Sequence, residues 1–151
     1  MQLTTRGRYA VTAMLDLSSY SQSGPIRLAE ISTRQEISLS YLEQLFAKLR
    51  RRGLVRSVRG PGGGYILAES PQAITIADII RAVDEPLKAT SCDNDDNDSC
   101  RKSSRCITHH LWVRVGQHLI DYLESVSLEK LLLESRAADH HSGLTLPGSE
   151  P

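Results

Sequence analysis

A predicted helix that is followed at once by a glycine-rich hairpin constrains the fold of this chain more than any other feature. Apolar residues recur at helical spacing from Leu39 to Leu49, which predicts a third helix from Ser38 or Leu39 to Arg52, and Gly53 follows as a helix stop. Two short β-prone runs come next, residues 54–58 and 65–68, joined by the loop RGPGGG. Such runs around a glycine-rich loop predict an antiparallel hairpin.

Three more helices are expected around this unit. Apolar spacing predicts a first helix over residues 9–20, with Thr4 or Thr5 as its cap, and a short second helix over 28–34. A fourth helix over 74–83 should pack back on the first three. This order of elements is that of a winged helix-turn-helix, whose third helix enters the DNA major groove while the hairpin wing contacts a neighbouring groove or backbone. A helical domain with a surface hairpin and no DNA contact is the alternative.

The distribution of charge favours the nucleic-acid interpretation. The chain balances 18 Lys and Arg against 18 Asp and Glu, but residues 1–60 hold ten basic and only four acidic side chains. Such asymmetry is typical of a protein with one basic end that meets nucleic acid, although charged surfaces that only face water are also common. The basic residues at the end of the third helix and along the hairpin, where phosphate contacts would lie, are Arg50, Arg51, Arg52, Arg56 and Arg59.

The start of the third helix carries the side chains that could reach base edges. Gln44 can pair bidentately with adenine, and Glu43 can accept a hydrogen bond from the cytosine amino group. Glu43 has a second interpretation, because Ser40 and Glu43 match a capping box, while Ser38 is an equally good N-cap. The base-edge candidates are Ser38, Ser40, Tyr41, Glu43 and Gln44.

The glycine loop of the hairpin does not match a nucleotide-binding motif. It lacks the GxGxxG spacing, no Gly-Lys-Ser/Thr follows, and a strand rather than a helix comes next. The loop is better interpreted as a flexible wing tip, in which glycine lets the backbone approach a groove and Arg59 suits a narrow minor groove.

A polar segment in the second half of the chain holds all three cysteines, Cys92, Cys100 and Cys106, with His109 close behind. The segment has too few apolar residues to form a core, so a metal or a cluster is expected to order it. Zinc remains an alternative, but zinc sites usually contain a close Cys-x-x-Cys pair, and the gaps here are seven and five residues. A calcium loop is disfavoured because Ser104 stands where a glutamate is needed. An iron-sulfur cluster held by three thiolates and one imidazole fits such long gaps.

A long amphipathic helix is predicted over residues 107–126, followed by a short helix from Ser127 to Leu133 and a disordered tail over 135–151. The apolar stripe of the long helix is too large for a small four-helix unit to cover, so pairing with a second copy of the chain is expected. Two-fold pairing would place two third helices about one DNA turn apart on a pseudo-palindrome. The stripe consists of Trp112, Val115, Leu119, Leu123 and Val126.

The sequence also limits where the protein acts. No apolar run reaches the ~18 residues that a membrane span needs, and the N-terminus lacks the apolar core of a signal peptide, so a soluble cytoplasmic protein is expected. No pairing of a nucleophile with a base is recognisable, which argues against an enzyme. The expected division of the chain is a winged helix-turn-helix domain over 1–86, a cluster-binding loop over 87–108, a dimerisation helix with a short C-terminal helix over 109–134, and the tail over 135–151.

Four runs of the sequence are distinctive. They are LTTRGRYAV at 3–11, ISLSYLEQLF at 37–46, VRGPGGGY at 58–65 and CITHHLW at 106–112. Together they resemble the regulators of iron-sulfur cluster assembly, within a wider family of bacterial winged-helix repressors, and the resemblance covers residues 1–133. The chain departs from that pattern in its first cysteine gap, because the family usually has five residues where Cys92 and Cys100 enclose seven.

The resemblance implies a mainly α fold with a small β-hairpin wing and a long dimerisation helix. It implies a homodimeric repressor that binds double-stranded DNA and carries one [2Fe-2S] cluster per subunit on Cys92, Cys100, Cys106 and His109, with [4Fe-4S] or zinc as alternatives. Cluster-donating assembly proteins would supply the cluster, whose occupancy would change which promoters are bound. Among the expected contacts, Ser40, Glu43 and Gln44 match the family's base-contacting positions, and Arg59 matches its wing arginine. The full set of expected DNA contacts is Arg8, Tyr9, Ser38, Ser40, Tyr41, Glu43, Gln44, Arg50, Arg51, Arg59 and Gly60.

Overall fold

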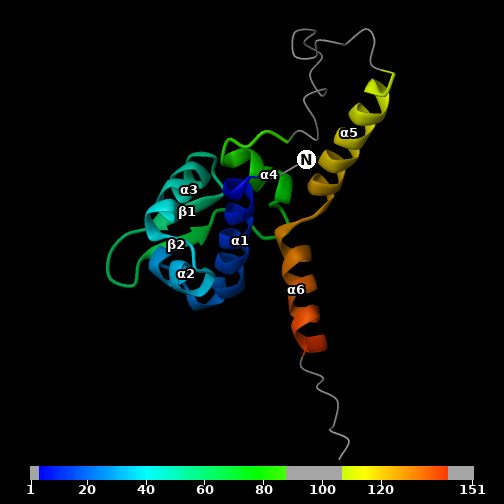
Figure 1. Ribbon diagram of the computed structural model, residues 1–151. Helices are drawn as coiled ribbons and strands as arrows, with labels where there is room; N and C mark the ends of the chain where they lie inside the picture. The colour runs from blue at the N-terminus through cyan, green and yellow to red at the C-terminus, as the bar shows by residue number, and fades with distance from the viewer. Residues whose placement is uncertain (1–3, 88–106, 143–151) are drawn as a thin grey trace, which may run out of the picture.

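The computed structural model of the protein describes residues 4–87 and 107–142, and its elements follow the predicted order (Figure 1). They are α1 (Thr5–Tyr20), a 3₁₀ turn (Ser21–Ser23), α2 (Leu28–Gln35), α3 (Leu39–Arg51), β1 (Val55–Val58), β2 (Gly64–Leu67), α4 (Ile76–Ala82), α5 (His109–Ser125) and α6 (Leu128–Ser142). In Figure 1, α1 lies in the middle of a body formed with α2, α3, α4 and the hairpin, α5 extends away from it, and α6 lies beside α1. The predicted fold class is confirmed.

The core forms around one face of α1, as the helical spacing of its apolar residues predicts. The buried apolar side chains of α1 are Ala10, Ala13, Met14 and Leu17, and those of α3 are Leu42, Leu45, Phe46 and Leu49. Full burial of a side chain such as Leu or Met contributes about 1.5–3 kcal/mol to stability. Leu39 differs from the prediction, because its side chain is 41% exposed in the first turn of α3, beyond the edge of the core.

The hairpin is fixed at its base and projects at its tip. Its two strands are antiparallel, with Val55 opposite Leu67 and Val58 opposite Gly64. A short bridge joins it to the segment before α2, since the Tyr65 N–H donates to the Ile26 carbonyl over 2.7 Å and the reverse bond is 2.9 Å. A Cβ atom at position 64 would overlap the Ile26 carbonyl, so this approach requires Gly64. The loop 59–63 therefore extends from a firmly held base.

Two helix boundaries differ from the predicted ranges by more than two residues. The first helix begins at Thr5, ahead of the predicted range that starts at Tyr9 but directly after the predicted cap Thr4. The Thr4 side chain makes no capping hydrogen bond, and its backbone N–H donates to Glu85, far away in sequence. The predicted end of the last helix at Leu133 is wrong, since α6 continues to Ser142. Its packing against α1, with Leu131 against the core, supports a longer helix than its own pattern predicts. Residues 143–151 lie outside the described part of the chain.

A buried ion pair ties α1 to α2. Asp16 has a fully buried side chain and accepts two hydrogen bonds from Arg34, over 2.7 and 3.0 Å, and one from Gln35 over 2.8 Å. The hydrogen bond with Asp16 raises the pKa of the Arg34 guanidinium above its ordinary value. Arg34 also lies 4.0 Å from the centre of the Tyr20 ring, a cation–π contact.

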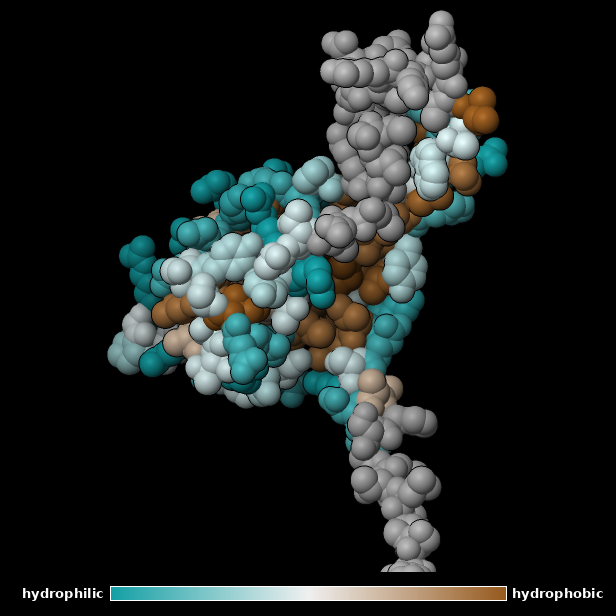
Figure 2. Space-filling model, viewed as in Figure 1, coloured by the Kyte–Doolittle hydropathy of each residue, from teal (hydrophilic) through white to brown (hydrophobic). Residues whose placement is uncertain are grey.

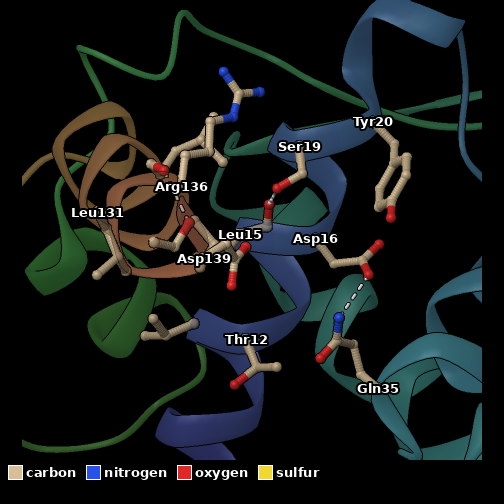
Figure 3. Close-up of a pocket in the computed structure, with 12 residues that line it drawn as sticks. Thr12, Leu15, Asp16, Ser19, Tyr20, Gln35, Leu131, Arg136 and Asp139 are labelled. Atoms are coloured by element: carbon tan, nitrogen blue, oxygen red, sulfur yellow. Dashed lines mark hydrogen bonds between the residues drawn. The ribbon is translucent and has the colours of Figure 1, made fainter. Parts of the chain in front are cut away.

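A cavity of about 570 Å³ opens between α1 and α6 (Figure 3). In the close-up, Arg136 and Asp139 of α6 lie across from Leu15 and Ser19 of α1. The buried carboxylate in its wall is Asp16, whose oxygens are already paired as described above. None of the helices in the two described ranges is long and apolar enough to cross a membrane.

Replacement of Asp16 should destabilise the protein strongly. Asp16→Ala removes the buried carboxylate that accepts hydrogen bonds from the exposed residues Arg34 and Gln35, so the free energy of unfolding should fall by about 1.5–3 kcal/mol, measured by urea denaturation. Glu124→Ala is the control, because it removes an exposed ion pair with Arg81 (2.6 Å) and should cost less than ~1 kcal/mol. Equal losses in the two variants would show that the buried pair has no special role.

Candidate nucleic-acid interface

The structure decides which serine caps the third helix. The Ser38 hydroxyl accepts a hydrogen bond from the Tyr41 N–H over 3.3 Å, and α3 begins directly after it at Leu39. Ser40 therefore lies inside the first turn, where it cannot serve as the N-cap. The alternative role of Glu43 as a partner in a capping box with Ser40 is thus excluded, and Glu43 is exposed.

The first turns of α1 and α3 lie next to each other. The rings of Tyr9 and Tyr41 meet edge to face with their centres 5.9 Å apart. Next to this contact, α3 exposes Ser40, Glu43 and Gln44 on one face. The contact therefore brings Tyr9, from the first run of the sequence, next to the predicted α3 side chains from the second run.

Arg8 is placed differently from its neighbour Tyr9. It is exposed, but it borders a groove of about 250 Å³ between α1, α4 and α5, with Val11, Ile80 and Leu123 among the other lining residues. The structure does not bring Arg8 to the contact between Tyr9 and Tyr41. Of the predicted contacts on α1, only Tyr9 joins the α3 surface directly.

The basic residues at the end of α3 divide into two groups. Arg50 and Arg51 are exposed and have no ion pair within the described residues. Lys48 and Arg52 instead approach one carboxylate, Asp84, over 2.9 and 3.7 Å. The hydrogen bond from Lys48, and then the charges of Lys48 and Arg52, hold the pKa of Asp84 below its usual range, so that it is ionised at neutral pH.

Sequence reasoning did not find Asp84. It lies after α4 in a left-handed backbone conformation, with φ of 57°, and no local motif links it to a helix 32 to 36 residues earlier. Only the packing of α4 on α3 brings the carboxylate to these cations. The run of three arginines at positions 50–52 therefore offers fewer free charges than it contains.

The tip of the hairpin exposes both predicted wing residues. Arg59 and Gly60 follow β1, and the Gly63 N–H closes the turn by donating to the Gly60 carbonyl over 2.9 Å. Gly60 has φ of 98°, a conformation that favours glycine. Arg56 is exposed on β1 as well, so the hairpin carries positive charge along its length.

The predicted cluster ligands lie only partly within the described chain. Cys92, Cys100 and Cys106 are outside the described residues, and in the described part no group of three or more potential metal ligands occurs. His109, the first residue of α5, is half-buried, and its Nδ1 atom is buried with no hydrogen-bond partner in the ranges the structure describes. Such an imidazole nitrogen fits the donor that a metal or an iron-sulfur cluster needs.

The apolar stripe of α5 differs in part from the prediction. Val126 is only 5% exposed and belongs to the core, and Leu123 packs against the core, so the lower end of the stripe is covered within the chain. Near the N-terminal end of α5, the side chains of Leu111 and Trp112 are 53% and 39% exposed. Figure 2 shows brown, apolar surface gathered where α5 and α6 join the helical body.

An exposed third helix, a projecting basic hairpin and a short second helix packed against the third define a winged helix-turn-helix protein of the DNA-binding class. A family model described as an iron-dependent transcriptional regulator, Rrf2, matches residues 3–134. The chain belongs to the Rrf2 family.

Individual relatives agree with this assignment. The HTH-type transcriptional regulator IscR of Photorhabdus laumondii is 52% identical over 139 residues, which are 92% of this chain and 84% of the relative, and IscR of Pectobacterium carotovorum is 50% identical with the same coverage. Among solved structures, IscR of T. potens has a TM-score of 0.75 and 36% identity over 98% of this chain and 94% of its own. CymR, the global cysteine regulator of B. subtilis, has a TM-score of 0.74 and 36% identity, with 89% and 98% covered. The predicted resemblance is confirmed, and these relatives are transcriptional regulators rather than enzymes.

The two serines at the start of α3 should differ in their effect on stability. Ser38→Ala removes the side-chain cap, so the free energy of unfolding should fall by about 1 kcal/mol, whereas Ser40→Ala should change it by less than ~0.5 kcal/mol. Urea denaturation of both variants measures the difference. A larger loss for Ser40→Ala would contradict the assignment of Ser38 as the cap.

Proposed function

We propose that this chain is a cytoplasmic, homodimeric DNA-binding regulator, mainly a repressor, of iron-sulfur cluster biogenesis genes. The observation that carries the proposal is the contact between Tyr9 and Tyr41, beside which the exposed residues of α3 form one surface. The names of the IscR relatives and the iron-dependent description of the family support the regulatory role.

In this proposal, α3 enters the major groove with its first turns. Gln44 pairs with adenine, and Glu43 accepts from cytosine while it repels sites that lack such a donor. Ser38 keeps a hydroxyl hydrogen free to donate, although its oxygen caps the helix. Arg50 and Arg51 contact phosphates.

The wing and α1 complete the interface. Arg59, at the exposed hairpin tip, enters the minor groove, where the small Gly60 lets the backbone come close. Tyr9 reaches the DNA backbone beside α3. Arg8 stays a proposed contact at the edge of the surface, because it also borders the groove between α1 and α4.

The proposed dimer forms along α5. Leu111, Trp112 and Val113 are exposed near its beginning, where α5 extends away from the body, and a second copy could cover them (Figure 1). Two-fold symmetry then presents two copies of α3 to a pseudo-palindromic site in double-stranded DNA.

We further propose that Cys92, Cys100, Cys106 and His109 hold a [2Fe-2S] cluster, delivered by cluster-donating assembly proteins. The occupancy of such a cluster depends on the supply of iron and sulfide and on oxidation, so a bound cluster would report that supply. The unpartnered Nδ1 atom of His109 supports this assignment from the described side of the site. A [4Fe-4S] cluster or zinc would use the same donors, and metal analysis distinguishes them.

Variants of α3 and the wing test the DNA contacts. An operator is first selected from a random duplex library with the wild-type protein, and binding is then measured by fluorescence anisotropy. Gln44→Ala should cost about 1–3 kcal/mol and relax the preference at one base pair, while Arg59→Ala should weaken binding and reduce its salt dependence by about one unit of slope.

Arg136→Ala is the matched control, because it removes an exposed arginine of α6 that lies at the cavity of Figure 3 and not at the interface. Its binding should equal that of the wild type. Unchanged binding by Arg59→Ala would show that the hairpin is not a wing, and a wild-type protein that selects no sequence would overturn the proposed function.

Metal analysis tests the cluster. Protein purified without oxygen should absorb visible light and contain about two irons and two sulfides per chain. His109→Ala should lose most of this absorbance during desalting, whereas His118→Ala, which alters another histidine of α5, should retain it. A colourless wild-type protein with stoichiometric zinc would contradict the cluster assignment and favour the zinc-stabilised alternative.

A further inference from the structure

Two adjacent acidic residues after α4 reach the two helices of the proposed DNA interface. The backbone N–H groups of Asp84 and Glu85 donate to the carbonyls of Arg81 and Ile80, over 3.1 and 3.4 Å, which fixes both residues to the end of α4. Their side chains then diverge, so that one connection contacts both α1 and α3.

Glu85 holds the first turn of α1. Its side chain is buried, and its Oε1 atom accepts a hydrogen bond from the Thr4 N–H at the N-cap of the helix. A Cβ atom at position 7 would overlap the carboxylate, so Gly7 is what allows Glu85 to lie against the helix backbone. The Nη1 atom of Arg6 adds a weak bond to the Val83 carbonyl over 3.5 Å. Tyr9, which contacts α3, lies within the same two turns.

Asp84 holds the last turn of α3. The carboxylate accepts from Lys48 over 2.9 Å and lies 3.7 Å from Arg52. These two cations flank Arg50 and Arg51, which are free of ion pairs in the described chain. Positive charge binds any DNA sequence through phosphates, so a carboxylate that offsets one of these positive charges lowers binding that does not depend on sequence.

We propose that Asp84 and Glu85 are positioning residues that raise the preference for operator over random DNA without touching DNA. Glu85 keeps Tyr9 in register with α3, which supports operator binding. Asp84 withholds Lys48 and Arg52 from phosphates, which restrains random binding. The inference rests on the DNA interface of the proposed function.

Substitution of Asp84 should increase the affinity for DNA, which the loss of a merely structural contact would not do. Asp84→Asn should raise the affinity for a random duplex roughly three- to tenfold and steepen its salt dependence by about one unit of slope, since the one negative charge that offsets these cations is removed. Operator affinity should rise less, so the ratio of operator to random affinity falls. The full-length chain is titrated with both duplexes at several salt concentrations.

Variants that remove the two cations test whether Asp84 acts through Lys48 and Arg52. Lys48→Gln with Arg52→Gln should lower random-DNA affinity below the wild-type value, because two positive charges are lost and Asp84 is left without its cations, and adding both to Asp84→Asn should abolish the gain. If Asp84→Asn leaves the ratio unchanged, or if the gain survives the loss of both cations, the role of Asp84 is overturned.

The positioning role of Glu85 is tested by comparing a conservative substitution with the removal of its side chain. Glu85→Gln retains an oxygen that can accept from the Thr4 N–H, so operator affinity should stay within about twofold of the wild type, while Glu85→Ala should lose at least about fivefold with random-DNA affinity unchanged. Glu129→Gln, whose side chain bonds Gln72 on another surface, is the control.

The outcomes separate the two proposals. Unfolding temperatures and the fraction of active protein are measured for each variant, and affinities are compared per active molecule. An equal loss of operator and random binding in Glu85→Ala overturns its positioning role. Failure of the wild type to prefer any operator counts instead against the proposed function.

Discussion

The burial of one face of α1 is the interaction on which the rest of the structure depends. This helix contacts α2, α3, α4, α6 and β2, so each of these elements takes its position from the same central surface. Because that face is built from Ala10, Ala13, Met14 and Leu17, which include two small residues, neighbouring elements approach α1 closely. Tyr9 can therefore meet Tyr41 at the surface that we propose binds DNA.

Carboxylates from distant parts of the chain hold this arrangement in place. Asp16 joins α1 to α2 beside the core, where its buried oxygens accept hydrogen bonds from Arg34 and Gln35. Asp84 and Glu85 act at the opposite side, on the ends of α3 and α1. Each acidic group is paired with a cation or a helix terminus, so the charges near the interface are set by tertiary contacts as much as by composition.

Local patterns predicted most of the helices and the hairpin, because apolar spacing and a glycine-rich loop are signals that neighbouring residues carry by themselves. They placed the third helix within one residue of α3. They failed at the end of α6, where packing against α1 accompanies a longer helix. They also could not choose between Ser38 and Ser40 as the cap, which only the backbone geometry decides.

The sequence alone determined the fold class, the resemblance to cluster-assembly regulators and the candidate set of DNA contacts that we propose, since each of these depends on short runs of residues. Tertiary structure alone decided that Tyr9 joins the surface of α3, that Arg8 borders a separate groove, and that Val126 belongs to the core. It also decided that Arg52 lies near Asp84, while Arg51 has no ion pair in the part of the chain that the structure describes. The reason is physical: a charge or a ring acquires its role from what packs against it, and those neighbours are distant in sequence.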